Sequence, residues 1–127
     1  MSFGHTLKRF REARNLSLRE FGKLCEIDHA YIFRLEREEK TAPSEPVVNT
    51  FVRTLKLSPR RSRLLRLMVG KSINHTLIDL FIDDEGLPLD LLEPAYQMSF
   101  RGKRPVTKDD WRAHVDRLAR LFGEFDD

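Results

Sequence analysis

The stretch "SLREFGKLCEIDHAYIFRLE", residues 17–36, predicts two short helices separated by a tight turn. Ser17 and Glu20 have the spacing of a capping box, in which the serine hydroxyl accepts from the amide of Glu20 and the glutamate accepts from the amide of Ser17. Asp28 follows the short connection "EID" and can cap a second helix over residues 29–37. The stretch therefore predicts two helices joined by a turn of a few residues.

Three more helices are expected around this pair. Apolar residues at intervals of three or four predict a helix over residues 3–14. Pro46 suits the start of a helix over residues 46–57, and Ser58 with Pro59 suits the start of another, which Gly70 can end. In the helix over residues 46–57 we expect four buried side chains, those of Val47, Phe51, Val52 and Leu55. Residues 1–70 thus predict a five-helix domain.

The rest of the chain also predicts helices. Residues 73–86 and 87–100 are apolar segments expected to form core elements, the second of them a helix. Thr107 can cap a last helix, whose apolar stripe holds Trp111, Val115, Leu118, Leu121, Phe122 and Phe125. We therefore predict an all-α protein with a small helical domain over residues 71–127.

Composition excludes several classes of protein. No segment of the 127 residues approaches the roughly 18 apolar residues that span a bilayer, and the N-terminus lacks the apolar core of a signal peptide, so we expect a cytoplasmic protein without a membrane partner. Cys25 is the single cysteine and no HExxH motif occurs, so neither a disulfide nor a zinc site is expected. We predict no catalytic residues, no metal and no cofactor, and hence no enzymatic activity.

Charge is divided unevenly along the chain. Residues 1–70 contain 15 Lys and Arg against 8 Asp and Glu, a net charge of +7, whereas residues 71–127 contain 8 against 12, a net charge of −4. The basic half favours a polyanionic partner.

The predicted helix pair has the pattern of a helix-turn-helix, whose later helix lies in the DNA major groove. A helix about 10–12 Å across fits a groove about 12 Å wide. The longer segment "LKRFREARNLSLREFGKLCEIDHAYIFRLEREEKTAPSEPVVNTFVRTLKLS" resembles the Xre/Cro-type helix-turn-helix repressors over about residues 3–70. This resemblance implies a lambda-repressor-like domain that binds double-stranded DNA. The chain departs from the usual pattern at Leu18, Gly22, Glu26, Phe33 and Glu38.

The resemblance also implies site residues. Base contacts are expected from His29, Ala30, Phe33 and Arg34, and backbone contacts from Arg19, Tyr31, Arg37 and Lys40. Arginine donates two parallel hydrogen bonds to guanine, and apolar side chains touch the thymine methyl group. Two alternatives remain: Tyr31 and Phe33 are core or interface aromatics, or Arg34 pairs with Glu38 four residues later. Glu36 is left out, because in this family that acid supports the turn.

A second resemblance covers the C-terminal end. The segment "LLEPAYQMSFRGKRPVTKDDWRAHVDRLARLF" resembles the end of DdrO-like repressors, which are paired with ImmA/IrrE-type zinc metalloproteases. It implies a cleavage loop at Phe100, Arg101 and Gly102, cut before the arginine. The cut would release a helix needed for dimerisation, with Trp111, Val115, Leu118, Leu121 and Phe122 as its contacts. The alternative is an ordinary solvated loop or a phosphate-contacting patch.

Together these observations predict a dimeric repressor that binds a palindromic operator and is inactivated by a partner protease. One alternative is an antitoxin that neutralises a partner toxin or protease through its C-terminal half and regulates its own operon. A second is an interaction adaptor that keeps the fold without using DNA.

Overall fold

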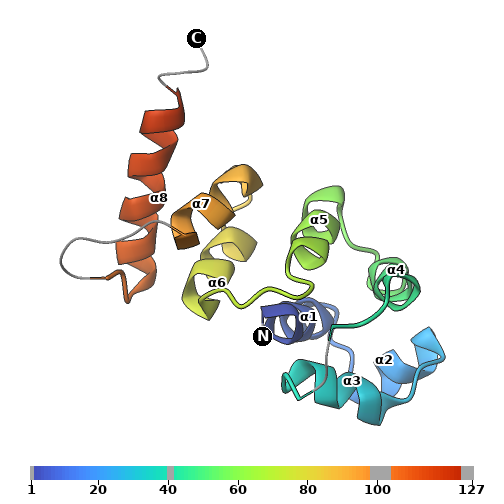
Figure 1. Ribbon diagram of the computed structural model, residues 1–127. Helices are drawn as coiled ribbons and strands as arrows, with labels where there is room; N and C mark the ends of the chain where they lie inside the picture. Colours follow the sequence, from blue (N-terminus) through green and yellow to red (C-terminus); the bar gives the residue numbers. More distant parts are fainter. Residues whose placement is uncertain (1, 40–41, 98–103, 124–127) are drawn as a thin grey trace. The chain divides into compact units, whose positions relative to one another are not determined.

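The computed structural model describes residues 2–39, 42–97 and 104–123, and within these ranges the protein is all-helical, as predicted (Figure 1). Clustering of contacts divides it into two compact units, Met1–Ser72 and Ile73–Asp127. The first unit contains α1 (Ser2–Ala13), α2 (Leu18–Cys25), α3 (His29–Glu36), α4 (Glu45–Thr54) and α5 (Pro59–Leu67). The second contains α6 (His75–Asp83), a short 3-10 helix η1 (Leu89–Leu91), α7 (Leu92–Gln97) and α8 (Lys108–Gly123).

Local capping signals place α2 and α3. The Ser17 hydroxyl accepts from the amide of Glu20 and a Glu20 carboxylate oxygen accepts from the amide of Ser17, each at 3.1 Å. Asp28 accepts from the amide of Ala30 at 3.0 Å. Both predicted caps are confirmed, so the start of each helix is set by side chains next to it in the sequence.

The turns around this pair hold non-glycine residues in the left-handed region. Glu26 after α2 has φ 58° and Glu38 after α3 has φ 63°, positions where glycine is usual because it has no Cβ. Gly22 is needed for a different reason: an added Cβ would lie 2.8 Å from the carbonyl oxygen of Ile27 and 3.0 Å from the Cβ of His29. Glu26 and Glu38 thus adopt a backbone conformation that is unfavourable for a residue with a Cβ. A side chain at position 22, in contrast, would clash with the turn.

The core of the first unit joins α1, α2 and α4 through aromatic rings that pack at a tilt to one another. Phe51 lies with its ring centroid 5.4 Å from that of Phe21 and 6.3 Å from that of Phe3. In α4 the expected buried face is partly wrong. Val47 and Val52 are half-buried, while Val48, Phe51 and Leu55 fill the core. The spacing 48, 51, 55 follows one helical face, and the apolar residues on either side of it lie at the rim.

The second unit is closed by α8, which packs on α6, η1 and α7. Thr107 caps α8 as predicted, since its hydroxyl accepts from the amide of Asp110 at 3.1 Å. The single helix expected over residues 87–100 is wrong over its described part, because a 3-10 turn after Pro88 precedes the short α7. Pro88 has extended backbone angles (φ −62°, ψ 127°), so the helical run begins only after it.

Two features are absent from the ranges that the structure describes. No helix in them has both the length and the apolar character that a bilayer crossing requires. No three His, Cys, Asp or Glu side chains in them gather as a metal ion would require.

Candidate nucleic-acid interface

The two faces of α3 differ sharply in exposure. Ile32 and Leu35 are 0% and 3% exposed and anchor the helix in the core, whereas Phe33 is 42% exposed. His29 and Arg34 are also exposed, and Ala30 and Tyr31 are half-buried. Positions 30, 33, 34 and 37 share one helical face. The structure therefore brings the four predicted base-contacting residues to the outer side of α3.

A buried ion pair fixes the C-terminal end of α3 against α1. Arg11 donates to both carboxylate oxygens of Glu36, from Nε at 2.7 Å and from Nη2 at 2.9 Å. Its Nη1 donates to the carbonyl of Leu16 at 2.7 Å. The hydrogen bond to Glu36 raises the pKa of Arg11 above its ordinary value. Glu36 is thus committed to the fold, as expected, and does not face outward with its neighbours.

Close backbone approach completes the attachment of α3. An added Cβ on Gly4 of α1 would lie 2.1 Å from the carbonyl oxygen of Leu35. The guanidinium of Arg14 donates to the carbonyls of Leu55 and Lys56 at 2.7 and 3.0 Å, which ties the end of α1 to the end of α4. The close approach at Gly4 thus packs the end of α3 directly against α1.

The outer face of α3 combines an aromatic ring with cations. The Arg37 guanidinium carbon lies 5.4 Å from the centroid of the Phe33 ring, within the range of a cation–π contact, and Arg37 Nε lies 3.3 Å from Glu39 Oε1. Phe33 is therefore not a core residue. None of the ion pairs among the described residues joins Arg34 to Glu38. The interpretation of Arg34 as half of a helical ion pair thus finds no support.

A groove lies where α2 meets the start of α3 and brings Arg19 and His29 together. Its lining residues are Arg19, Glu20, Gly22, Lys23, Glu26, Ile27, Asp28 and His29. Lys23 lines this groove but is not among the contact residues expected from the sequence, although its place in the first helix of the pair could have suggested it. Lys40 lies outside the described residues.

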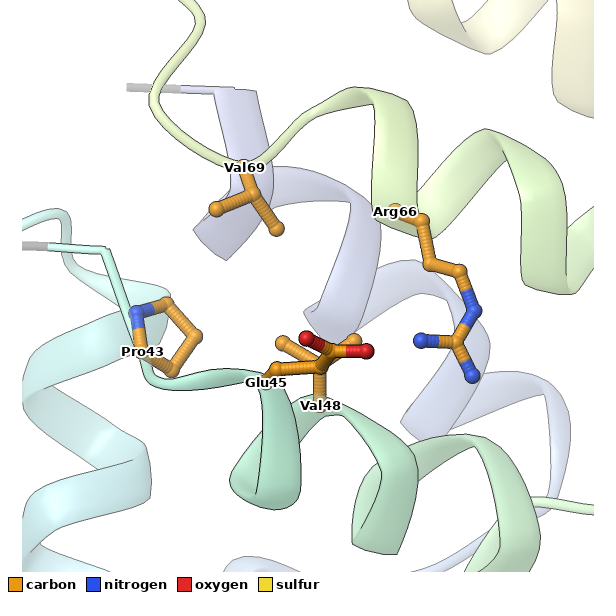
Figure 2. Close-up of a pocket in the computed structure, with 5 residues that line it drawn as sticks. All are labelled: Pro43, Glu45, Val48, Arg66 and Val69. Atoms are coloured by element: carbon orange, nitrogen blue, oxygen red, sulfur yellow. The ribbon is translucent and has the colours of Figure 1, made fainter.

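A smaller pocket of about 280 Å³ lies between the start of α4 and the end of α5 (Figure 2). Pro43, Val48 and Val69 supply its apolar lining, and Glu45 and Arg66 its charges. No residue of α3 lines it, so it is separate from the row of predicted base-contacting residues.

The predicted dimer contacts on α8 do not form a surface stripe. Trp111, Val115 and Leu118 are 2%, 0% and 4% exposed because they pack inside the second unit. Leu121 is 51% exposed, and the side chain of Phe122 lies outside the described part of the structure. To close this unit, α8 must turn its apolar face toward α6 and α7. The apolar stripe is therefore buried within the unit.

His114 is a member of that stripe which the sequence analysis missed, although it follows Trp111 by three residues. It is 4% exposed, and its Nε2 lies 3.1 Å from the carbonyl oxygen of Ala95. Burial lowers the pKa of His114 below its ordinary value, and the contact with Ala95 opposes this only in part.

The predicted cleavage residues Phe100, Arg101 and Gly102 lie outside the described residues. The segment that follows them is accessible: Arg104 is exposed and Val106 is 64% exposed.

Comparison with known proteins adds one match. A family model described as a helix-turn-helix domain matches residues 2–65, which takes in α1 to α4 and most of α5. A search of curated proteins found no match to the chain.

Proposed function

Because the chain belongs to the helix-turn-helix family and is a DNA-binding regulator, we propose that it is a transcriptional repressor that reads a palindromic operator as a homodimer. The observation that carries the proposal is the two-sided α3, with Ile32 and Leu35 inward and Phe33 and Arg34 outward.

Base recognition is assigned to the outer face of α3. Arg34 donates two hydrogen bonds to the O6 and N7 of a guanine, a contact that discriminates between bases by about 1–3 kcal/mol. His29 reaches a base edge from the start of the helix, and Ala30 or Phe33 contacts a thymine methyl group. The exposure of all these positions but the half-buried Ala30 supports this assignment.

Backbone contacts are assigned to residues around this row. Arg19 lies in the first turn of α2, where the amide dipoles also favour a phosphate. Tyr31, Arg37 and Lys40 are assigned to phosphates beside or beyond α3. These contacts set the position of the protein on the duplex without reading its sequence.

Dimerisation follows from the limited reach of one recognition helix. Repressors of this geometry place two such helices on half-sites about 34–36 Å apart. We assign the joining of two copies to the second unit. Trp111, Val115 and Leu118 act there by holding α8 in place, and Leu121 is its exposed apolar position.

Inactivation is assigned to a partner metalloprotease of the ImmA/IrrE type that cuts between Phe100 and Arg101. The exposure of Arg104 and Val106 supports access to this segment, and the burial of the α8 stripe explains why release of α8 would be disruptive. Incubation with a metalloprotease of the ImmA/IrrE type, followed by mass spectrometry, should give a fragment beginning at Arg101. A cut elsewhere would reject the assigned bond.

The decisive experiment for the repressor is selection of bound sites from random duplexes. A recovered palindrome with half-sites one helical turn apart is expected, since two copies would each read one half. Enrichment of a single unrepeated half-site would reject the dimer, and no enrichment at all would reject sequence-specific binding.

A further inference from the structure

The pocket between the start of α4 and the end of α5 has the composition of a small-molecule site. Its lining is mainly apolar, since Pro43 and Val48 are buried and Val69 is half-buried. Its two other lining residues, Glu45 and Arg66, are charged and exposed. Ligand sites in proteins combine a mainly apolar lining with a few polar groups that fix the orientation of the ligand. The pocket therefore has both parts that such a site requires.

The local structure brings each charge to the pocket together with a valine. Glu45 is the first residue of α4, and Val48 follows it by three positions on the same side of the helix. Arg66 lies in the last turn of α5, and the amide of Val69 donates to its carbonyl oxygen at 3.3 Å. Figure 2 shows the side chains of Arg66 and Val69 directed toward the start of α4. A carboxylate from one helix and a guanidinium from the other thus border the same apolar lining.

The two charges do not pair with each other directly. No ion pair among the described residues joins Glu45 to Arg66. An ionised carboxylate only accepts hydrogen bonds, whereas a guanidinium only donates them. A ligand with a single charge would therefore satisfy one of these two groups. A ligand that carries both a carboxylate and an ammonium group would satisfy both.

We propose that this pocket binds a free α-amino acid with an aliphatic side chain, such as leucine. The ligand carboxylate accepts from the guanidinium of Arg66, whose planar fork matches a carboxylate. The ligand ammonium group donates to the carboxylate of Glu45, and the aliphatic side chain lies on Pro43, Val48 and Val69. The volume of about 280 Å³ suits a ligand of this size, because pockets for drug-sized molecules occupy about 300–1,000 Å³.

The amino-acid site goes beyond the repressor function and does not depend on it. No residue of α3 lines the pocket, and binding of the amino acid can be measured without DNA. Failure of the protein to select an operator would therefore leave the amino-acid site intact, and the reverse also holds.

The test is a titration of the full chain followed by nuclear magnetic resonance. Leucine is compared with 4-methylpentanoate, which lacks the ammonium group, and with 3-methylbutylamine, which lacks the carboxylate. Leucine should shift the methyl resonances of Val48 and Val69 saturably and bind about three- to tenfold more tightly than either analogue. Glycine, which lacks the aliphatic side chain, should bind at least about tenfold more weakly than leucine. These comparisons use the wild-type protein and so need no substitution.

Two variants assign the charges. Arg66→Gln should weaken leucine about three- to tenfold without weakening 3-methylbutylamine, and Glu45→Gln should weaken leucine equally without weakening 4-methylpentanoate. The matched controls are Arg53→Gln and Glu12→Gln, which remove the same charges at exposed positions of the first unit outside the pocket. Both controls should bind leucine as the wild-type protein does.

Four results would overturn the proposal. The first is the lack of saturable shifts with leucine up to about 10 mM, which would mean that the pocket admits no amino acid. The second is saturation that leaves Val48 and Val69 unshifted, which would place the ligand elsewhere. The third is an analogue that binds as tightly as leucine, which would leave a site that recognises a single charge. The fourth is a folded pocket variant that binds leucine as tightly as the wild-type protein.

Discussion

Two arginines at the C-terminal end of α3, Arg34 in its last turn and Arg37 directly after it, illustrate how nearby residues of one type take different roles. Arg37 lies over the Phe33 ring and beside Glu39, so its guanidinium is already engaged in two contacts. Arg34 is exposed, and no ion pair in the described ranges engages it. Arg34 can therefore align both of its donors with a base, whereas Arg37 suits a phosphate at a set position.

The roles of Arg34 and Arg19 should separate in binding measurements. Arg34→Ala should cost about 1–3 kcal/mol on the selected operator and relax the preference at one base position of each half-site. Arg19→Ala should weaken binding to all sequences alike and reduce the salt slope by about one. Fluorescence anisotropy against an operator and its single-base variants measures both. Uniform loss from both substitutions would refute the division of roles.

The buried pair of Arg11 and Glu36 predicts a stability effect. Glu36→Ala leaves the Arg11 guanidinium buried without its carboxylate, which should cost about 3–5 kcal/mol of unfolding free energy. Glu39→Ala removes an acid whose partner Arg37 is exposed and should cost at most about 1 kcal/mol. Urea unfolding followed by circular dichroism compares them. Equal midpoints for the two variants would show that the buried pair stabilises the fold no more than the exposed pair does.

Among the helices, the starting residues could be predicted from the sequence, but the surfaces against which the helices pack could not. Ser17, Asp28 and Thr107 begin their helices as the sequence indicated, because a cap depends on residues three or fewer positions away. The burial of Trp111 shows the opposite case. Spacing identifies an apolar stripe on α8 but says nothing about whether its own chain or another copy covers it. Glu26 and Glu38 show a third case, where turn geometry overrides the preference for glycine.

The attachment of α8 should depend on pH through His114. Burial disfavours its charged form, so the folded protein binds fewer protons there than the unfolded chain, and stability is lost as pH falls below the ordinary value of 6.5. The thermal unfolding midpoint of the second unit should therefore decrease when the pH is lowered from 7.5 to 5.5. His114→Asn should flatten this dependence, whereas His75→Asn, at an exposed position of the same unit, should preserve it. An unchanged profile in the His114 variant would assign the dependence to other groups.

At the scale of the whole molecule, the division into two units predicts what loss of α8 does to each. A chain ending at Phe100 lacks Trp111, Val115 and Leu118, which complete the core of the second unit, while the contacts among α1 to α5 stay intact. Amide hydrogen exchange should therefore show protection kept in α1 to α5 and lost in α6 and α7.

If the second unit joins two copies, operator affinity should fall by about 10² to 10⁴ as the two recognition helices become independent. A chain ending at Gly123 is the matched control and should keep both properties. Protected amides in α6 of the shorter chain would mean that the second unit folds without α8, and a cut at Phe100 could not then act as the off switch.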